Sequence, residues 1–185
     1  HQSFWETFAV LPLLPDPCMV LKKELTFIPL FGWFALKFRM IAVERSAGTA
    51  ALKAMVARAR REIGEGRQVV IMPEGTRKGP DDPPDYKPGA AALYGALGVP
   101  CVPFGLNAGV FWPRRKFLRL PGTIVIEFLP AIPAGLPRKQ FQAELANHTD
   151  RMFQVKIPRQ IRPLQDLRGL TQLIRVIRLY KPQVL

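Results

Sequence analysis

A histidine and a carboxylate stand five positions apart at the start of the sequence, as His1 and Glu6. Within one helical turn or a tight loop their side chains can meet, and a carboxylate on one imidazole nitrogen leaves the other nitrogen basic. The pair could therefore act as a general base that removes a proton from a hydroxyl group. A terminal histidine that is disordered or left from a purification tag is the alternative.

Two further segments contain residues that can hold an anion. Arg45 directly precedes a predicted helix, where a guanidinium and free main-chain N–H groups could both bind a phosphate. In Glu74-Gly75-Thr76-Arg77, glycine permits close approach of the backbone, Arg77 could grip a phosphate with two hydrogen bonds, and Glu74 could orient a ligand hydroxyl. The alternatives are a solvated surface arginine and an ordinary turn.

An alternation of strands and helices must position these residues. Apolar runs predict strands at 17–22, 38–43, 68–72, 101–106 and 123–128, and helical periodicity predicts helices at 49–63, 90–97 and 138–153. The strand–helix–strand unit over 38–72 predicts parallel pairing. The expected fold class is α/β, with a mixed, mainly parallel sheet flanked by helices. Ligands bind beyond the carboxyl ends of such strands, where Arg45 and the Glu74–Arg77 segment lie.

The charge of the chain indicates an anionic partner. The 185 residues carry a net charge of +13, and residues 93–185 hold 14 basic and 4 acidic side chains. Such a surface favours nucleic acid, an anionic bilayer, or an acidic carrier. Nucleic acid is not expected, because aromatic and basic residues do not alternate along any predicted strand. Two cysteines exclude a disulfide scaffold and a four-cysteine zinc site.

The order of these segments resembles the 1-acylglycerol-3-phosphate acyltransferase family of glycerolipid synthesis, and most closely its bacterial branch. The matching segments are His1 to Glu6, Arg45, Glu74 to Arg77, Tyr86 to Gly89, and Val102-Pro103. The resemblance covers about residues 1–150, and Glu6 stands where the family more often has Asp.

The family also has a membrane-binding helical motif and a strand before its histidine. The resemblance therefore implies an N-terminally truncated chain, with an acyltransferase domain at 1–155 that lacks this motif. Residues 156–185 are expected to form a basic tail with an amphipathic pattern.

The resemblance further implies transfer of an acyl group from acyl-CoA or acyl carrier protein to the 2-hydroxyl of lysophosphatidic acid. His1 would take the hydroxyl proton while Glu6 holds its ring, so activity should fall when His1 is protonated. Arg77 and Arg45 would bind the acceptor phosphate. The remaining expected pocket residues are Glu74, Gly75, Thr76 and Lys87. No cofactor and no metal are expected, and Asp81, Asp82 and Asp85 are interpreted as solvated.

The expected setting is the cytoplasmic face of the bacterial inner membrane, with the protein peripheral or anchored through the missing N-terminal segment. An anionic membrane surface is therefore an expected partner, with the basic segment 112–119 and the apolar stripe in 166–181 as candidate contacts. Residues 25–36 and 99–106 are expected to wall the acyl slot, and His148 is expected on a helix surface. Two alternative functions stay open. One is acylation of another lysolipid (a lyso-ornithine lipid or a lysophospholipid), and the other is a catalytically dead fragment that binds anionic lipid.

Overall fold

The computed structural model describes residues 1–79, 82–113 and 119–153 of the chain. Asp81, most of the 112–119 segment and the 156–185 tail, for which the sequence made predictions, lie outside these residues. The helices are α1 (Trp5–Ala9), α2 (Phe31–Lys37), α3 (Gly48–Gly64), α4 (Pro88–Leu97), α5 (Ala108–Phe111) and α6 (Arg138–Phe153), with short 3₁₀ helices at Leu11–Leu13, Lys23–Phe27 and Arg45–Ala47. The strands are β1 (Pro17–Lys22), β2 (Ile41–Val43), β3 (Gln68–Val70), β4 (Phe104–Leu106) and β5 (Ile126–Phe128).

Two sheets form the centre of the fold. β1, β2 and β3 make a parallel sheet in the order β2-β1-β3, while β4 and β5 pair antiparallel in a second sheet. The α/β class with a parallel sheet flanked by helices is confirmed. The strands on either side of α3 run parallel as predicted, and β1 lies between β2 and β3. β1 takes this central place as the strand that buries the most side chains, among them Cys18 and Met19.

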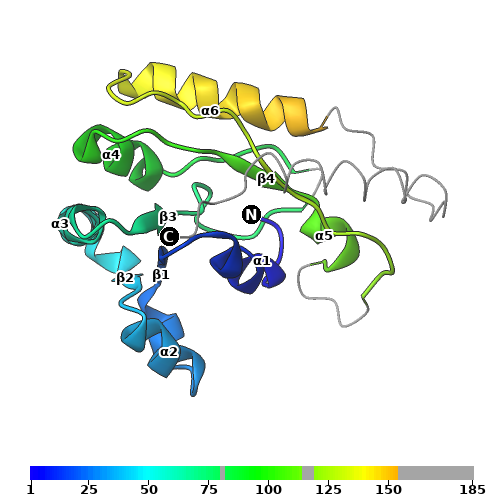
Figure 1. Cartoon of the computed structure of the whole chain (residues 1–185), viewed down its shortest axis with the longest axis horizontal. Helices are drawn as coiled ribbons and strands as arrows, with labels where there is room; N and C mark the ends of the chain where they lie inside the picture. The colour runs from blue at the N-terminus through cyan, green and yellow to red at the C-terminus, as the bar shows by residue number, and fades with distance from the viewer. Residues whose placement is uncertain (80–81, 114–118, 154–185) are drawn as a thin grey trace.

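Helices cover the sheets in layers (Figure 1). α3 and α4 pack together, and Met55, Ala59 and Leu93 form one core cluster with Cys18 and Ile41 from the parallel sheet. α6 lies on α4 as the outermost layer. Within the described residues, none of the helices combines the length and apolar character that crossing a bilayer requires.

The α4–α6 contact is centred on two stacked rings. The rings of Tyr94 and Phe141 lie 4.0 Å apart between centroids. The Tyr94 hydroxyl donates to the carbonyl of Pro133 and accepts the Leu136 N–H, so a chain segment between the helices is tied to the same residue.

A buried ionic cluster lies at the end of the parallel sheet where β1 and β3 begin. Glu62, at the end of α3, is completely buried and accepts hydrogen bonds from Arg67 at 2.7 Å and from Arg39 at 3.0 Å. Arg67 also binds Asp16 at 3.0 Å. Burial opposes ionisation of Glu62, but the hydrogen bonds from Arg67, Arg39 and Arg61 outweigh it, and the pKa of Glu62 lies below its ordinary value. Glu62 therefore stabilises the fold at neutral pH, and this contribution is lost as the pH falls through the lowered pKa.

We expect Arg67→Met to lower the free energy of unfolding by about 3 kcal/mol, because it leaves the buried Glu62 carboxylate without its principal partner. Urea unfolding at neutral pH measures the change. The double variant Arg67→Met/Glu62→Met removes both charges and should regain most of the loss. A double variant no more stable than Arg67→Met would mean that the loss comes from packing instead.

Candidate active site

His1 and Glu6 form a close pair at the start of the chain. Nδ1 of His1 lies 2.6 Å from Oε2 of Glu6, so the contact expected from their spacing is present. Glu6 is completely buried, whereas 16% of the His1 side chain is exposed. The carboxylate is thus held inside while the ring reaches the surface of a cavity described below.

The main chain just before α1 holds the Glu6 carboxylate in place. Its Oε1 accepts the main-chain N–H groups of Gln2, at 2.6 Å, and of Ser3. The Ser3 hydroxyl accepts the N–H of Trp5 at 3.3 Å. Only the half of a capping box in which the glutamate side chain accepts the serine N–H is therefore present. The sequence prediction missed Gln2 and Ser3, although the Ser-x-x-Glu spacing was a readable signal for Ser3.

The pKa of Glu6 is raised above its ordinary value. Burial is the largest cause, and it is opposed by the positive amino group of His1, by the N–H groups of Gln2 and Ser3, and by the charge of Arg77. When ionised, Glu6 can only accept hydrogen bonds, so the imidazole proton lies on Nδ1 and Nε2 is free to act as a base.

The Glu74–Arg77 turn lies against the same histidine. The main-chain nitrogen of His1 donates to Oε2 of Glu74 at 2.9 Å, and its carbonyl accepts the N–H of Lys78 at 2.8 Å. This turn follows β3, at the carboxyl end of the parallel sheet. The start of the chain and the Glu74–Arg77 turn, about 70 residues apart in the sequence, therefore meet at the carboxyl end of the parallel sheet.

Arg45 fixes the shape of the turn. Its guanidinium donates to the carbonyl of Gly75, whose φ is +64°, a value that glycine adopts without strain. A β-carbon at Gly75 would make only ordinary contact with the guanidinium, at 3.4 Å, so the backbone conformation is what favours glycine. Its contact with Gly75 places Arg45 next to the other candidate phosphate-binding residues. Arg45 is also exposed, so a ligand can reach its guanidinium.

The remaining candidates differ in their surroundings. Arg77 is half-buried, and its charge acts on Glu6. Thr76 is exposed. The ammonium of Lys87 pairs with Asp85 at 2.6 Å, while its main-chain N–H donates to the Pro73 carbonyl and holds the strand end that leads into the turn.

Asp82 and Asp85, which were interpreted as solvated, are exposed and have partners within the protein. Asp82 accepts the N–H of Gly79 at 2.6 Å, and Asp85 binds lysines. Among residues 1–79, 82–113 and 119–153, no three His, Cys, Asp or Glu side chains gather as a metal ion would require.

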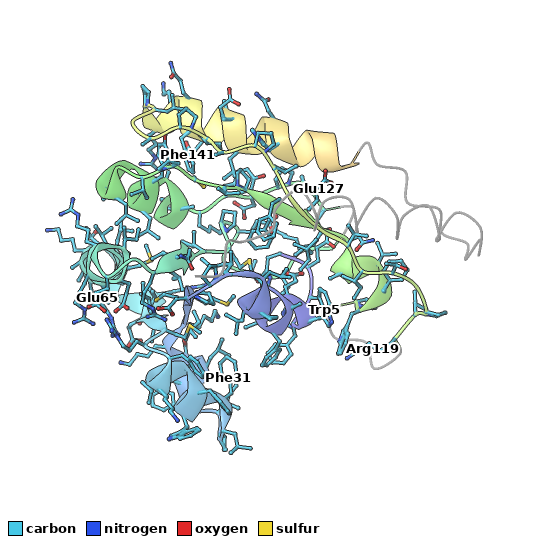
Figure 2. All side chains as sticks on the ribbon, viewed as in Figure 1. Trp5, Phe31, Glu65, Arg119, Glu127 and Phe141 are labelled. Atoms are coloured by element: carbon cyan, nitrogen blue, oxygen red, sulfur yellow. The ribbon has the colours of Figure 1, made fainter. Side chains whose placement is uncertain are left out.

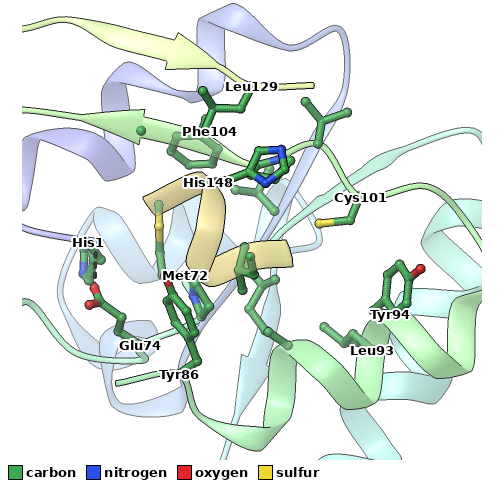
Figure 3. A pocket seen from close by; sticks show the side chains of 18 of the residues that line it. His1, Met72, Glu74, Tyr86, Leu93, Tyr94, Cys101, Phe104, Leu129 and His148 are labelled. Atoms are coloured by element: carbon green, nitrogen blue, oxygen red, sulfur yellow. Dashed lines mark hydrogen bonds and ion pairs between the residues drawn. The ribbon is translucent and has the colours of Figure 1, made fainter. Parts of the chain in front are cut away.

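A cavity of about 530 Å³ opens beside the histidine. His1 and Glu74 lie at one side of it, and Leu93, Tyr94 and Cys101 at the other (Figure 3). Residues 99–106, one of the two segments expected to wall the acyl slot, line this cavity, whereas residues 25–36, the other segment, do not. The large side chains around α2 are exposed, and the assignment of the two segments to the acyl slot stays a prediction.

The cavity runs along the edges of two strands. Consecutive residues line it, at 68–74 on β3 and its extension and at 99–106 on β4 and its approach. A sheet face would contribute alternate residues only, so the walls include strand edges with their main-chain N–H and C=O groups. Gln2 joins the start of the chain to α5, since its side-chain oxygen accepts the N–H of Gly109 at 2.9 Å.

Comparison with known proteins identifies this arrangement. A family model described as Acyltransferase matches residues 1–107. A 1-acyl-sn-glycerol-3-phosphate acyltransferase from Pseudomonas aeruginosa is 37% identical over 134 residues, which are 72% of this chain and 52% of the relative. The 1-acyl-sn-glycerol-3-phosphate acyltransferase beta of Homo sapiens is 30% identical over 137 residues, 73% of this chain and 49% of its own. The chain belongs to the acyltransferase family.

The likeness extends to a solved structure of the family. The 1-acyl-sn-glycerophosphate (LPA) acyltransferase PlsC from Thermotoga maritima superposes with a TM-score of 0.64 at 20% identity, covering 82% of this chain and 63% of that one. This match shows a shared fold. The present chain spans about half the length of the curated acyltransferases that it matches.

One titratable residue of this acyltransferase lies where the sequence did not place it. His148 was expected on a helix surface, but it is buried, at 9% exposure, and lines the cavity from α6. Its Nδ1 lies 2.7 Å from the carbonyl of Glu144. Phe141, Leu145 and His148 recur at helical spacing on the face that packs inward, and this stripe was the signal that could have placed the histidine.

Proposed function

We propose that this acyltransferase moves a fatty acyl group from acyl-CoA or acyl carrier protein to the 2-hydroxyl of 1-acylglycerol-3-phosphate, which yields phosphatidic acid. The observation that carries the proposal is the 2.6 Å His1–Glu6 contact beside the Glu74–Arg77 turn. This arrangement places a general base, His1, next to arginines that can bind a phosphate. The names of the relatives support this choice of acceptor.

The proposed reaction needs no covalent enzyme intermediate. Nε2 of His1 takes the proton of the 2-hydroxyl as its oxygen attacks the thioester carbonyl, and Glu6 stabilises the imidazolium that forms. The carbon–sulfur bond then breaks, and the imidazolium returns its proton to the leaving thiolate. Neutral imidazole and ionised Glu6 are the active forms, so turnover should fall as the pH is lowered.

The acceptor phosphate is assigned to Arg77 and Arg45. Both lie at the Glu74–Arg77 turn, where Arg45 binds Gly75 and the charge of Arg77 reaches Glu6. Gly75 provides a conformation that other residues adopt only with strain, and Thr76 offers an exposed hydroxyl. Lys87 adds positive charge only in part, because Asp85 neutralises it.

The test is acylation in vitro. The purified chain is incubated with an acyl thioester and lysophosphatidic acid, and both free thiol and phosphatidic acid are measured. Parallel reactions with acyl-CoA and acyl carrier protein, and with a lyso-ornithine lipid and a lysophospholipid as acceptors, compare the alternatives. If product forms only with another acceptor, that lysolipid is the substrate. If no combination of donor and acceptor gives product, the alternative of a catalytically dead fragment that binds anionic lipid is favoured.

We expect Arg77→Lys to raise the KM for lysophosphatidic acid about tenfold with little change in the KM for the thioester. Lysine keeps the charge but loses the guanidinium fork that binds two phosphate oxygens at once. Steady-state kinetics with each substrate varied in turn measures the split.

Arg58→Lys is the matched control, because Arg58 is an exposed arginine on α3. It should leave both constants unchanged. Equal changes in both KM values of Arg77→Lys would assign Arg77 to the fold rather than to the phosphate.

A further inference from the structure

Gln2 is held at two points in the candidate active site. Its main-chain N–H donates to Oε1 of Glu6 at 2.6 Å, and its side-chain oxygen accepts the N–H of Gly109 at 2.9 Å. Gly109 belongs to the first turn of α5, where the N–H groups have no acceptor within their own helix. Figure 2 shows α1, which contains Trp5, next to α5, so the side chain of Gln2 joins two neighbouring elements.

The contact with Gly109 fixes the orientation of the Gln2 side-chain amide. An N–H group can only donate, so the amide atom that faces Gly109 is the oxygen, and the NH₂ lies on the other side of the group. Within the described residues this NH₂ makes no hydrogen bond. In the same part of the chain, no fully buried side-chain nitrogen or oxygen lacks a partner. The NH₂ of Gln2 is therefore both unused and accessible.

Gln2 lines the same cavity as the general base. The His1 ring contacts Oε2 of Glu6 and the Gln2 main chain contacts Oε1, so one buried carboxylate orients both residues. Both side chains reach the cavity wall, from α-carbons that are about 3.8 Å apart. A substrate group that is attacked with the help of His1 therefore lies within reach of the Gln2 amide.

Two cationic side chains on the same cavity wall already have acidic partners. The guanidinium of Arg67 binds the buried Glu62 at 2.7 Å, and the ammonium of Lys78 lies 3.9 Å from Asp85. A substrate acceptor would have to compete with these carboxylates for either cation. The NH₂ of Gln2 can take a substrate acceptor without breaking a contact within the described residues.

Attack on a thioester carbonyl needs a donor of this kind. The hydroxyl oxygen of the acceptor bonds to the carbonyl carbon while its proton passes to Nε2 of His1, and the C=O electron pair moves onto the carbonyl oxygen. Donors that are oriented before the reaction stabilise this oxyanion, and glutamine amides are among the groups that can do so. When the C=O bond forms again, the carbon–sulfur bond breaks and the imidazolium returns its proton to the thiolate.

We propose that the side-chain NH₂ of Gln2 donates a hydrogen bond to the thioester oxygen as it becomes negative, which makes Gln2 a second catalytic residue beside His1. The proposal rests on the proposed function for the thioester donor, but it does not depend on which lysolipid is the acceptor. Gly109 is a positioning residue in this arrangement, because its N–H holds the amide oxygen and so orients the NH₂.

Two substitutions separate a catalytic donor from a structural contact. Gln2→Met removes both the NH₂ and the acceptor for Gly109, whereas Gln2→Glu keeps the acceptor and replaces the NH₂ with a negatively charged oxygen. We expect Gln2→Met to lower kcat about a hundredfold and Gln2→Glu to lower it at least as much, with little change in the KM for lysophosphatidic acid. The kcat is measured on the plateau of the pH profile, because a carboxylate beside His1 shifts that profile to higher pH.

Gln140→Glu is the matched control for this pair. It makes the same change at an exposed position on α6 and should keep the kinetics of the parent chain. Circular dichroism melting checks that all three variants fold. If Gln2→Glu retains more kcat than Gln2→Met, the side chain of Gln2 serves only to hold α5, and the proposal is wrong.

A binding measurement tests the proposal without turnover. One acyl thioester analogue carries a fluorinated ketone, which hydrates to a tetrahedral group, and a second carries a saturated thioether without a carbonyl oxygen. Each is prepared on coenzyme A and on acyl carrier protein. In calorimetric titrations, both Gln2 variants should bind the ketone at least about tenfold more weakly than the parent chain, and the thioether equally well.

The binding measurement also distinguishes this proposal from the proposed function. A parent chain without turnover that still shows the ketone-specific difference would refute the proposed function and support the contact between Gln2 and the carbonyl oxygen. Equal binding of the ketone by the parent and both variants would overturn the role of Gln2. Failure of the parent chain to bind either analogue would overturn it as well.

Discussion

Glu6→Gln should lower kcat at least about a hundredfold without unfolding the protein. The amide oxygen of glutamine would stay with the N–H groups of Gln2 and Ser3, which can only donate. The amide NH₂ would then face Nδ1 of His1 and donate to it. The imidazole proton would move to Nε2, and a protonated Nε2 cannot accept the proton of the substrate hydroxyl.

Stability and a second substitution serve as controls for Glu6→Gln. Burial raises the pKa of Glu6 in the folded protein above its value in the unfolded chain. The contribution of Glu6 to the free energy of unfolding is therefore most favourable below the unfolded-state pKa, and it is lost as the pH rises through the raised, folded-state pKa. Removing the charge should therefore leave the melting temperature at neutral pH unchanged or higher. Glu6→Asp keeps an acceptor for Nδ1 and should lose much less activity. If Glu6→Gln lowers kcat no more than Glu6→Asp does, the position of the imidazole proton does not explain the loss of activity.

His1→Ala should also lower kcat at least about a hundredfold, through loss of the general base. The substitution removes the ring but retains the main-chain contacts of His1 with Glu74 and Lys78, so the Glu74–Arg77 turn should keep its place. The measurement is kcat at saturating acceptor and donor, compared with the KM of each substrate, which should change little.

A double variant tests whether His1 and Glu6 work as one unit. Residues that act in a single step give non-additive losses, so His1→Ala/Glu6→Gln should be no slower than the slower single variant. Added imidazole should restore part of the turnover of His1→Ala. Multiplied losses in the double variant would mean that Glu6 contributes to catalysis by a route other than His1.

Local features of the fold and the site could be predicted from the sequence. α3 was predicted because its buried side chains recur at helical spacing, and the His1–Glu6 contact was predicted because both residues lie within one turn. Arg45 and Gly75 each follow a strand of the parallel sheet, and the carboxyl ends of parallel strands lie at the same edge. Their contact could therefore be predicted from the order of strands and helices.

Features that depend on tertiary packing could not be predicted in this way. β1, β2 and β3 are all short apolar strands, and nothing in their composition states that β1 lies in the middle. Residues 25–36 were expected from the family resemblance to wall the acyl slot, and the structure shows most of their large side chains exposed. Their outward direction follows from the close approach of Gly32 to the main-chain carbonyl of Thr26, which is a property of the folded chain.

The strand edges along the cavity have a consequence for how the protein behaves in solution. In the part of the chain that the structure describes, β3 pairs with β1 and β4 pairs with β5, so each strand turns its other edge toward the same space. Main-chain donors and acceptors on two facing edges form a template for any extended peptide, which could bridge the sheets into one. A segment from a neighbouring molecule would fit as well as one from the same chain, and strand exchange should therefore grow with protein concentration and limit how far preparations can be concentrated.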